Sequence, residues 1–218
     1  VGSITAIVLN LLFFHVGPQS KGEDVALGAS GKRRSLQEVN AMSDQDFVKT
    51  FSGLFNGVTW PLLSAAQMRP FRDTGELKEA LQDAVLLADK ELQNQLISAY
   101  PDVTMMLTVS DHDAKKISQD VGSLALGELS EHQRSQLQTL ETSYHEKFNL
   151  PLVALLSRMG SVEEIIKDGL RRLENSPRLE RVVALGQVVE IANDRFEIMM
   201  ADANPIRSAW SRKFEQLD

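Results

Sequence analysis

Apolar residues recur at intervals of three and four positions through most of the chain beyond residue 40. This spacing places them on one face of an α-helix, and no run of alternating apolar and polar residues typical of a strand interrupts the pattern. The first such set is Phe47, Val48, Phe51, Leu54 and Phe55. The pattern predicts an all-α domain over residues 41–200, a compact bundle of roughly seven or eight helices.

Capping residues and prolines indicate where these helices begin and end. Ser43, Ser130 and Ser161 each precede Asp, Gln or Glu by three positions, as in an N-terminal capping box. Thr74 is expected to cap another helix. The residue before a proline disfavours the α region, so Pro101 ends a helix. The expected helices begin near Ser43, Trp60, Thr74, Lys90, Ala114, Ser130, Ser161 and Pro177, with a loop at 102–112.

The two ends of the chain follow different patterns. Residues 1–14, VGSITAIVLNLLFF, are mostly apolar but fall short of the roughly 20 residues that a membrane-spanning helix needs. Residues 15–40 are rich in Gly, Ser and charge, which is typical of a flexible linker. Residues 201–218 are interpreted as a C-terminal tail.

Charge and cysteine content exclude several kinds of function. The 218-residue chain has a formal net charge of −7, which argues against nucleic-acid binding, because that function requires a basic surface. A few local arginines could still bind a small anion. The chain has no cysteine, so disulfides, thiolate catalysis and cysteine-ligated zinc are excluded.

Catalytic and metal-binding motifs are sparse. There is no phosphate-binding Gly-rich loop and no G-x-S-x-G sequence, and none of the four histidines forms an H-x-x-x-H pair. His112 lies between two aspartates, where a solvated loop is favoured over a metal site. His145 follows Glu141 by four residues, so a surface pair is expected. Neither a metal nor a cofactor is predicted.

A series of short motifs nonetheless occurs in a recognisable order between about residues 40 and 198. It runs from VNAMSDQDFVKTFSGLFNGVTW through RPF and LISAYPDV to LGELSEHQRSQLQTLETSYHEKFNLPLVALLSR, RRLENS and ALGQVVEIANDRFE. The set resembles the 2-oxo-4-hydroxy-4-carboxy-5-ureidoimidazoline (OHCU) decarboxylase family. The resemblance implies an all-helical homodimer without a cofactor. Its substrate would be a small anionic purine-breakdown product, decarboxylated to (S)-allantoin during urate degradation.

The same resemblance implies a site with a histidine, a glutamate and an arginine. Tyr100 stands at the position of the histidine, in LISAYPDV where the family has L-I-x-x-H-P-D-L. Asp120 stands at or next to the position of the glutamate, and Arg195 matches the arginine. Histidine has an ordinary pKa near 6.5 and tyrosine near 10, so Tyr100 would act as a neutral proton donor rather than as a base. Residues implied to bind substrate are Pro101, Ser118, Leu152, Val153 and Arg158.

Each of these residues also has a purely structural interpretation. Tyr100 could be a ring packed at a helix end, and Asp120 a solvated helix carboxylate. Arg195 could pair with a neighbouring acid, namely Asp194, Glu190 or Glu197. Arg158 could hydrogen-bond into the loop before the helix that starts near residue 161. The sequence leaves both readings open.

The first fourteen residues carry a second resemblance. They are similar to the last transmembrane helix of xanthine/uracil-type nucleobase permeases, which end in a G-x-x-x-A-x-x-L-N-L-L-F pattern. This suggests a decarboxylase-like domain fused to a permease and tethered at the cytoplasmic face of the membrane; the alternative is an incidental apolar tail. If the altered site is inactive, the domain would instead bind a ligand or act as a scaffold for the permease.

Overall fold

The computed structural model describes residues 33–107 and 129–201, and in these ranges the chain is helical without a β-strand. The all-α prediction is therefore confirmed. The elements are α2 (Leu36–Ala41), α3 (Asp44–Phe51), the 3-10 helix η1 (Ser52–Phe55), α4 (Trp60–Ala66), α5 (Thr74–Leu86), α6 (Lys90–Ser98), α7 (Val103–Leu107), α9 (Glu131–Phe148), the 3-10 helix η3 (Leu156–Arg158), α10 (Val162–Arg172) and α11 (Pro177–Met199).

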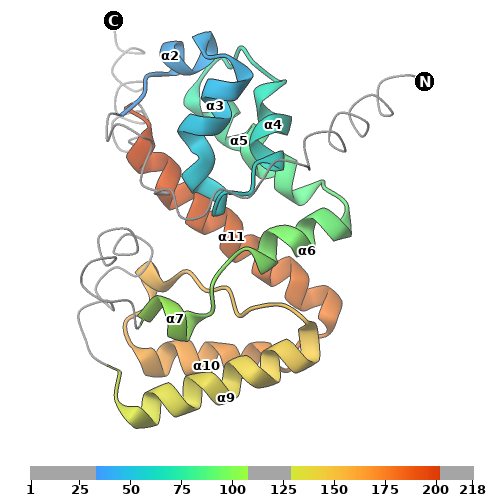
Figure 1. The fold of residues 1–218 in the computed structure, drawn as a ribbon, viewed down its shortest axis with the longest axis vertical. Helices are drawn as coiled ribbons and strands as arrows, with labels where there is room; N and C mark the ends of the chain where they lie inside the picture. The colour runs from blue at the N-terminus through green and yellow to red at the C-terminus, as the bar shows by residue number, and fades with distance from the viewer. Residues whose placement is uncertain (1–32, 108–128, 202–218) are drawn as a thin grey trace, which may run out of the picture.

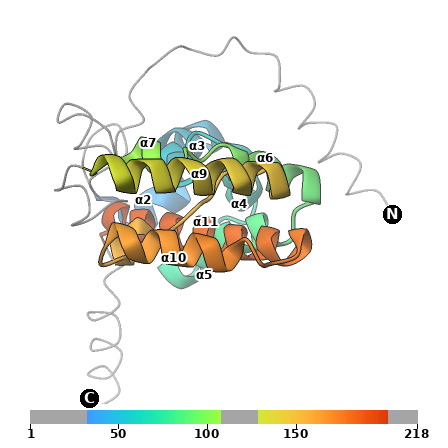
Figure 2. The ribbon, with the colours of Figure 1, turned by 90° about the horizontal axis from the view of Figure 1, so that it is seen from below.

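The longest of these helices, α11, connects two groups of helices (Figure 1). Helices α2 to α5 lie around its C-terminal half, and α7, α9 and α10 lie at the other end of the molecule. Helix α11 contacts η1, α5 and α6 as well as α9. Figure 2 shows the same arrangement from below, with α9 and α10 extending in similar directions. One helix thus reaches both halves of the core.

Aromatic side chains join α3 to α11. Phe47 and Phe51, one turn apart on α3, have ring centroids separated by 4.8 Å, and the Phe51 ring stacks on that of Phe196 at 6.4 Å. All three side chains are buried. Their burial agrees with the face that the apolar spacing predicts, and it removes large apolar surfaces from water.

The predicted caps form, with one exception. Ser43 accepts a hydrogen bond from the backbone N–H of Asp46, and Ser130 forms a full capping box with Gln133. Ser161 accepts from the backbone of its third following residue. Thr74 does not cap α5. Asp73 does, because its carboxylate accepts the Glu76 N–H, and Thr74 is the first helical residue.

Two expected irregular segments contain helices. Residues 36–40, assigned to the linker, belong to α2, which begins with a capping box between Ser35 and Glu38. Residues 103–107, expected to be loop, form α7. Both the N–H and the hydroxyl of Thr104 donate to Glu141 on α9, at 2.7 and 2.8 Å. A carboxylate from a distant helix therefore stabilises the start of α7, and local sequence cannot show this.

The N-terminal side of the described domain is joined to its C-terminal side. Arg34 and Met200 form an isolated parallel bridge. The Arg34 N–H donates to the Met199 carbonyl and the Ala201 N–H donates to the Arg34 carbonyl, each at 2.8 Å. Within the described ranges, no helix has both the length and the apolar character needed to cross a membrane. The segment 1–14 and the helix expected from residue 114 lie outside those ranges.

Candidate functional site

Arg195 lies on α11 and is held against the end of η1. Its Nη1 donates to the carbonyl oxygens of Gly53 at 2.8 Å and Leu54 at 3.0 Å, and to Oδ1 of Asn56 at 2.8 Å. Carbonyl groups at the C-terminal end of a helix carry partial negative charge and favour a cation. These contacts differ from the ion pair with a neighbouring acid that the structural interpretation of Arg195 expected.

Tyr100 lies beside Arg195. The tyrosine follows Ala99, the C-cap of α6, and is only 5% exposed. The guanidinium carbon of Arg195 lies 5.9 Å from the centroid of the Tyr100 ring, which is within the range of a cation–π interaction. The fold thus brings together two predicted catalytic residues that are 95 positions apart in the sequence (195 − 100). Their catalytic role stays a prediction.

A third residue at this place, Asn56, is not indicated by the sequence motifs. It has a left-handed backbone conformation, with φ of 50° and ψ of 39°, at the C-terminal cap of η1. Besides accepting from Arg195, its amide donates through Nδ2 to the carbonyl oxygen of Ala99 at 3.3 Å. Asn56 thus connects η1, α11 and the residue that precedes Tyr100. The only local signal is the Asn-Gly dipeptide, which is typical of a turn.

Arg158 occupies a different environment. It lies at the end of η3 with 60% of its side chain exposed, and its Nη2 contacts Asp194 at 3.0 Å and Glu190 at 3.2 Å on α11. The hydrogen bond and charge of Asp194 raise its guanidinium pKa. Two of the acids that the sequence suggested for Arg195, Asp194 and Glu190, therefore pair with Arg158. The third, Glu197, pairs with Lys78. Its predicted role in substrate binding is untested.

The remaining predicted residues, the catalytic candidate Asp120 and four binding candidates, divide into two groups. Pro101 is half-buried beside Tyr100, and the side chains of Leu152 and Val153 are 1% and 2% exposed, within the core. Ser118 and Asp120 lie outside the described residues.

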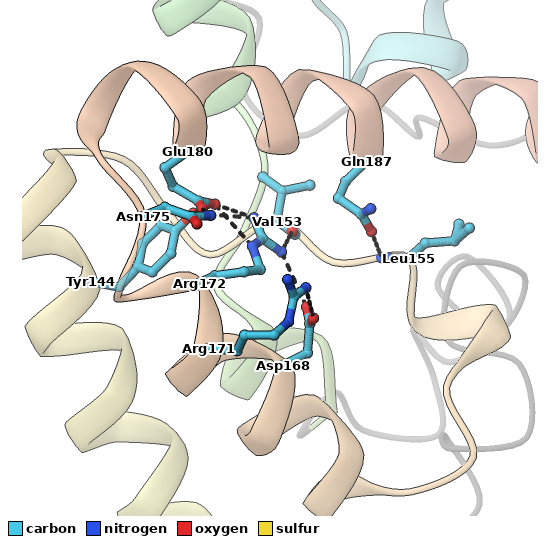
Figure 3. A network of polar contacts seen from close by, with 9 residues as sticks. All are labelled: Tyr144, Val153, Leu155, Asp168, Arg171, Arg172, Asn175, Glu180 and Gln187. Carbon is cyan, nitrogen blue, oxygen red and sulfur yellow. Dashed lines mark hydrogen bonds and ion pairs between the residues drawn. The ribbon is translucent and has the colours of Figure 1, made fainter.

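A buried polar network fixes the segment that carries Leu152 and Val153 (Figure 3). Arg172 donates through Nη1 to the Val153 carbonyl at 2.7 Å, and through Nε and Nη2 to Glu180 at 2.9 and 2.6 Å. The Tyr144 hydroxyl donates to Glu180, and Asn175 Nδ2 donates to the second carboxylate oxygen at 2.6 Å. Burial raises the pKa of Tyr144, so its hydroxyl stays protonated. The network ties α9, α10 and α11 to one backbone segment.

Polar contacts also fix the chain after Tyr100. His145 Nε2 lies 2.9 Å from Asp102 Oδ1. The sequence favoured a pair between His145 and Glu141, and this was wrong in its partner, because Glu141 instead binds Thr104 at the start of α7. Burial raises the pKa of the Glu141 carboxyl, and the two hydrogen bonds from Thr104 oppose that rise. The described part of the chain holds no cluster of three His, Asp or Glu side chains suited to a metal ion.

Comparison with known proteins identifies the family of this fold and site. The sequence profile described as OHCU decarboxylase matches residues 40–197, which is most of the chain. The chain belongs to the OHCU decarboxylase family. Among curated relatives, the 2-oxo-4-hydroxy-4-carboxy-5-ureidoimidazoline decarboxylase of Haloferax volcanii is 32% identical over 162 residues, covering 74% of this chain and 93% of that protein.

Two other similar proteins support the same family assignment, and both are longer than this chain. A uric acid degradation bifunctional protein of Bacillus subtilis is 28% identical over 162 residues, covering 74% of this chain but only 32% of that protein. A crystal structure of (S)-allantoin synthase superposes with a TM-score of 0.59 at 16% identity, covering 77% of this chain and 54% of that one. This solved structure, of which the chain spans about half, shows that the fold is shared.

Proposed function

We propose that this domain is an OHCU decarboxylase that converts the ureidoimidazoline intermediate of urate degradation to (S)-allantoin. The observation that carries the proposal is the contact between Arg195 and Tyr100. The sequence resemblance matches these two residues to the family's arginine and histidine. The other support is the family membership itself, with a decarboxylase as a 32% identical relative.

The reaction breaks the bond between a ring carbon and the carboxylate carbon, and carbon dioxide leaves. The electron pair of that bond passes into the substrate ring, and a proton must then be delivered to the ring carbon. Arg195 would bind an anionic oxygen of the substrate and stabilise the charge that develops on the ring. Tyr100, with a phenol pKa ordinarily near 10, would take part as a neutral donor. Asp120 would place and protonate the substrate.

The residues expected to surround the substrate are those that the family resemblance implies. Pro101 adjoins Tyr100, and the Leu152–Val153 segment has its backbone fixed by Arg172 through the Val153 carbonyl. A fixed backbone suits a segment that positions a substrate, because small displacements of reacting groups slow a reaction strongly. Ser118 and Arg158 complete the proposed set.

The proposal is tested by generating the substrate in place from urate with the two preceding enzymes and following (S)-allantoin formation by circular dichroism. Wild-type protein should accelerate the decay over the spontaneous reaction. Arg195→Ala should slow the catalysed reaction about 10²–10³-fold, the usual effect of removing one charge-stabilising donor. The matched control is Arg171→Ala, whose side chain is 68% exposed on α10 and should leave the rate unchanged.

Two variants test Tyr100. Tyr100→Phe keeps the buried ring and removes the hydroxyl, so it should slow the reaction. Tyr100→His restores the family's residue, which exchanges protons near neutral pH, and should raise the rate. Wild-type protein that gives no acceleration contradicts the proposal. In that case, binding of (S)-allantoin measured by calorimetry would indicate a ligand-binding module instead.

We further propose that the domain works as a homodimer at the cytoplasmic face of a membrane, beside a nucleobase permease. The first part rests on the family resemblance, and the second on the likeness of residues 1–14 to the last helix of such permeases. Light scattering of the purified chain tests the dimer. Immunoblots of membrane and soluble fractions from native cells, with an antibody against residues 41–200, test the location; recovery only in the soluble fraction contradicts it.

A further inference from the structure

We infer that Asn56 is a positioning residue for the proposed decarboxylation, setting the orientation of the Arg195 guanidinium relative to Tyr100. The inference rests on the proposed function for its kinetic consequence. The structural part of the inference, that the Asn56 side chain orients Arg195, does not depend on that function and is drawn from the hydrogen bonds alone.

The side-chain amide of Asn56 both accepts and donates a hydrogen bond. Oδ1 accepts from Arg195 Nη1 at 2.8 Å, and Nδ2 donates to the Ala99 carbonyl at 3.3 Å. An amide oxygen only accepts and an amide nitrogen only donates, so one orientation of the side chain satisfies both contacts. Because Ala99 immediately precedes Tyr100, a single side chain connects the arginine to the backbone that carries the tyrosine.

The backbone at Asn56 explains why this residue type occurs here. Its φ of 50° lies in the left-handed region, and Gly57 follows with φ of 82°. Asparagine tolerates that region better than most residues with a side chain. Glycine would also fit but has no amide to offer, so asparagine is among the few residues that combine this turn with both hydrogen bonds.

Asn56 supplies a different kind of contact from the other two acceptors of Arg195 Nη1. The carbonyls of Gly53 and Leu54 belong to the backbone of η1 and persist when a side chain is changed. The neutral amide also leaves the positive charge of Arg195 undiminished. An aspartate at this position would place a negative charge next to the guanidinium and weaken its attraction for an anionic substrate.

These features predict distinct kinetics for two variants that both suit the left-handed backbone. Asn56→Gly removes both hydrogen bonds of the Asn56 side chain. The Gly53 and Leu54 carbonyls still accept from Arg195 Nη1, but the guanidinium is held less firmly, so kcat should fall about ten- to hundredfold with a smaller change in KM. Asn56→Asp keeps an acceptor for Arg195, loses the donor to Ala99 and adds a charge. Its KM for the anionic substrate should rise about tenfold or more, because charge attraction to the substrate is lost.

The matched control is Asn149→Gly. Asn149 also has a left-handed backbone, with φ of 53°, and it caps the C-terminus of α9. Asn149→Gly should have kcat and KM within about twofold of wild type, since Asn149 has no contact with Arg195 or Tyr100 among the described interactions. Melting temperatures of Asn56→Gly and Asn149→Gly, compared side by side, separate a general loss of stability from a specific loss of rate.

A readout independent of activity is the nitrogen-15 NMR spectrum of the arginine side chains, with Arg195 assigned from the Arg195→Lys spectrum. A guanidinium that is held by hydrogen bonds rotates slowly and gives separate signals for its two Nη atoms. In Asn56→Gly the two Nη signals of Arg195 should merge, and in Asn149→Gly they should stay separate. If wild-type protein shows no decarboxylation, the proposed function fails while this spectrum still tests Asn56. Unchanged Arg195 signals in Asn56→Gly, or kinetics equal to those of Asn149→Gly in an active enzyme, would overturn the inference.

Discussion

Arg172 is a charged residue placed inside the core, with 1% of its side chain exposed and a fully buried partner, Glu180. Taking both charges out of water is costly, and the cost is offset only when the groups are paired and their remaining hydrogen-bonding atoms are satisfied. Arg172 meets this condition through Glu180, the Val153 carbonyl and the Tyr144 hydroxyl. Removal of one charge should therefore cost more than removal of the pair.

Arg172→Met is expected to destabilise the domain by about 3–5 kcal/mol, because Glu180 would remain buried without its counter-charge. The neighbouring Arg171 has a side chain that is 68% exposed and pairs with Asp168, so Arg171→Met should cost at most about 1 kcal/mol. Urea unfolding of both variants measures the difference. Equal losses in the free energy of unfolding would mean that the buried ion pair contributes no more to stability than the exposed one.

Glu141 should make stability depend on pH. Burial raises its carboxyl pKa from the ordinary 4.5, so the folded chain binds this proton more tightly than the unfolded chain does. The stabilisation from this proton is fully present below the pKa that Glu141 has in the unfolded chain. It is lost as the pH rises through the pKa that Glu141 has in the folded chain. Glu141→Gln keeps an acceptor for the Thr104 N–H and does not ionise.

The free energy of unfolding of Glu141→Gln, relative to wild type, should therefore increase as pH is raised from about 4 to about 7. Urea unfolding at several pH values measures this difference, with Glu146→Gln, on the exposed side of the same helix, as the matched control. A difference that stays constant or decreases with pH would contradict the assignment.

Individual site residues were predictable from the sequence to the extent that motifs mark them. Tyr100 and Arg195 are candidates because of their motif positions, and the structure brings them into contact, while their catalytic role stays a prediction. Asn56 does not, because its two partners, Arg195 and Ala99, are distant in the sequence and only the fold brings them near. The network around Arg172 is hidden for the same reason, since no local pattern distinguishes a buried arginine from an exposed one.

At the scale of elements, helices were predictable where their signals are local. Ser130 with Gln133 correctly indicates the start of α9, because a capping box involves only neighbouring residues. Helix α7 was missed because its stabilising carboxylate, Glu141, comes from α9. Helix α2 carries a local capping box at Ser35, but the Gly- and Ser-rich composition of the preceding segment obscured it.

The contact between α9 and α10 depends on a glycine. A Cβ atom added at Gly169 would lie 2.5 Å from Leu140 Cδ2 and 3.0 Å from Leu152 Cδ2. Gly169→Ala should therefore force these core side chains apart and cost about 1–3 kcal/mol, despite the better helix propensity of alanine. Chemical denaturation measures the change.

The helical glycine of α11 provides the control. An added Cβ at Gly186 would meet no atom within 4 Å, so Gly186→Ala should stabilise the domain by about 0.5–1 kcal/mol. Opposite signs for the same substitution would show that packing, and not propensity, governs position 169. A stabilising Gly169→Ala would contradict the close contact.

At the scale of the whole molecule, α11 makes the two helical groups depend on each other. It contacts η1, α5 and α6 on one side and α9 on the other, so neither group keeps its full core when this helix unfolds. Calorimetry should show one heat-absorption peak with equal calorimetric and van't Hoff enthalpies. Two resolved peaks would show that the groups unfold independently.

The bridge between Arg34 and Met200 has a consequence for how this domain can be joined to other chains. Because Arg34 and Met200 lie side by side, the body between them can be spliced into a surface loop of a host protein without forcing the host's cut ends far apart. For the same reason, a short peptide could join the two flanks and new termini could be opened in an exposed turn, giving a circular permutant with its helices in their original places.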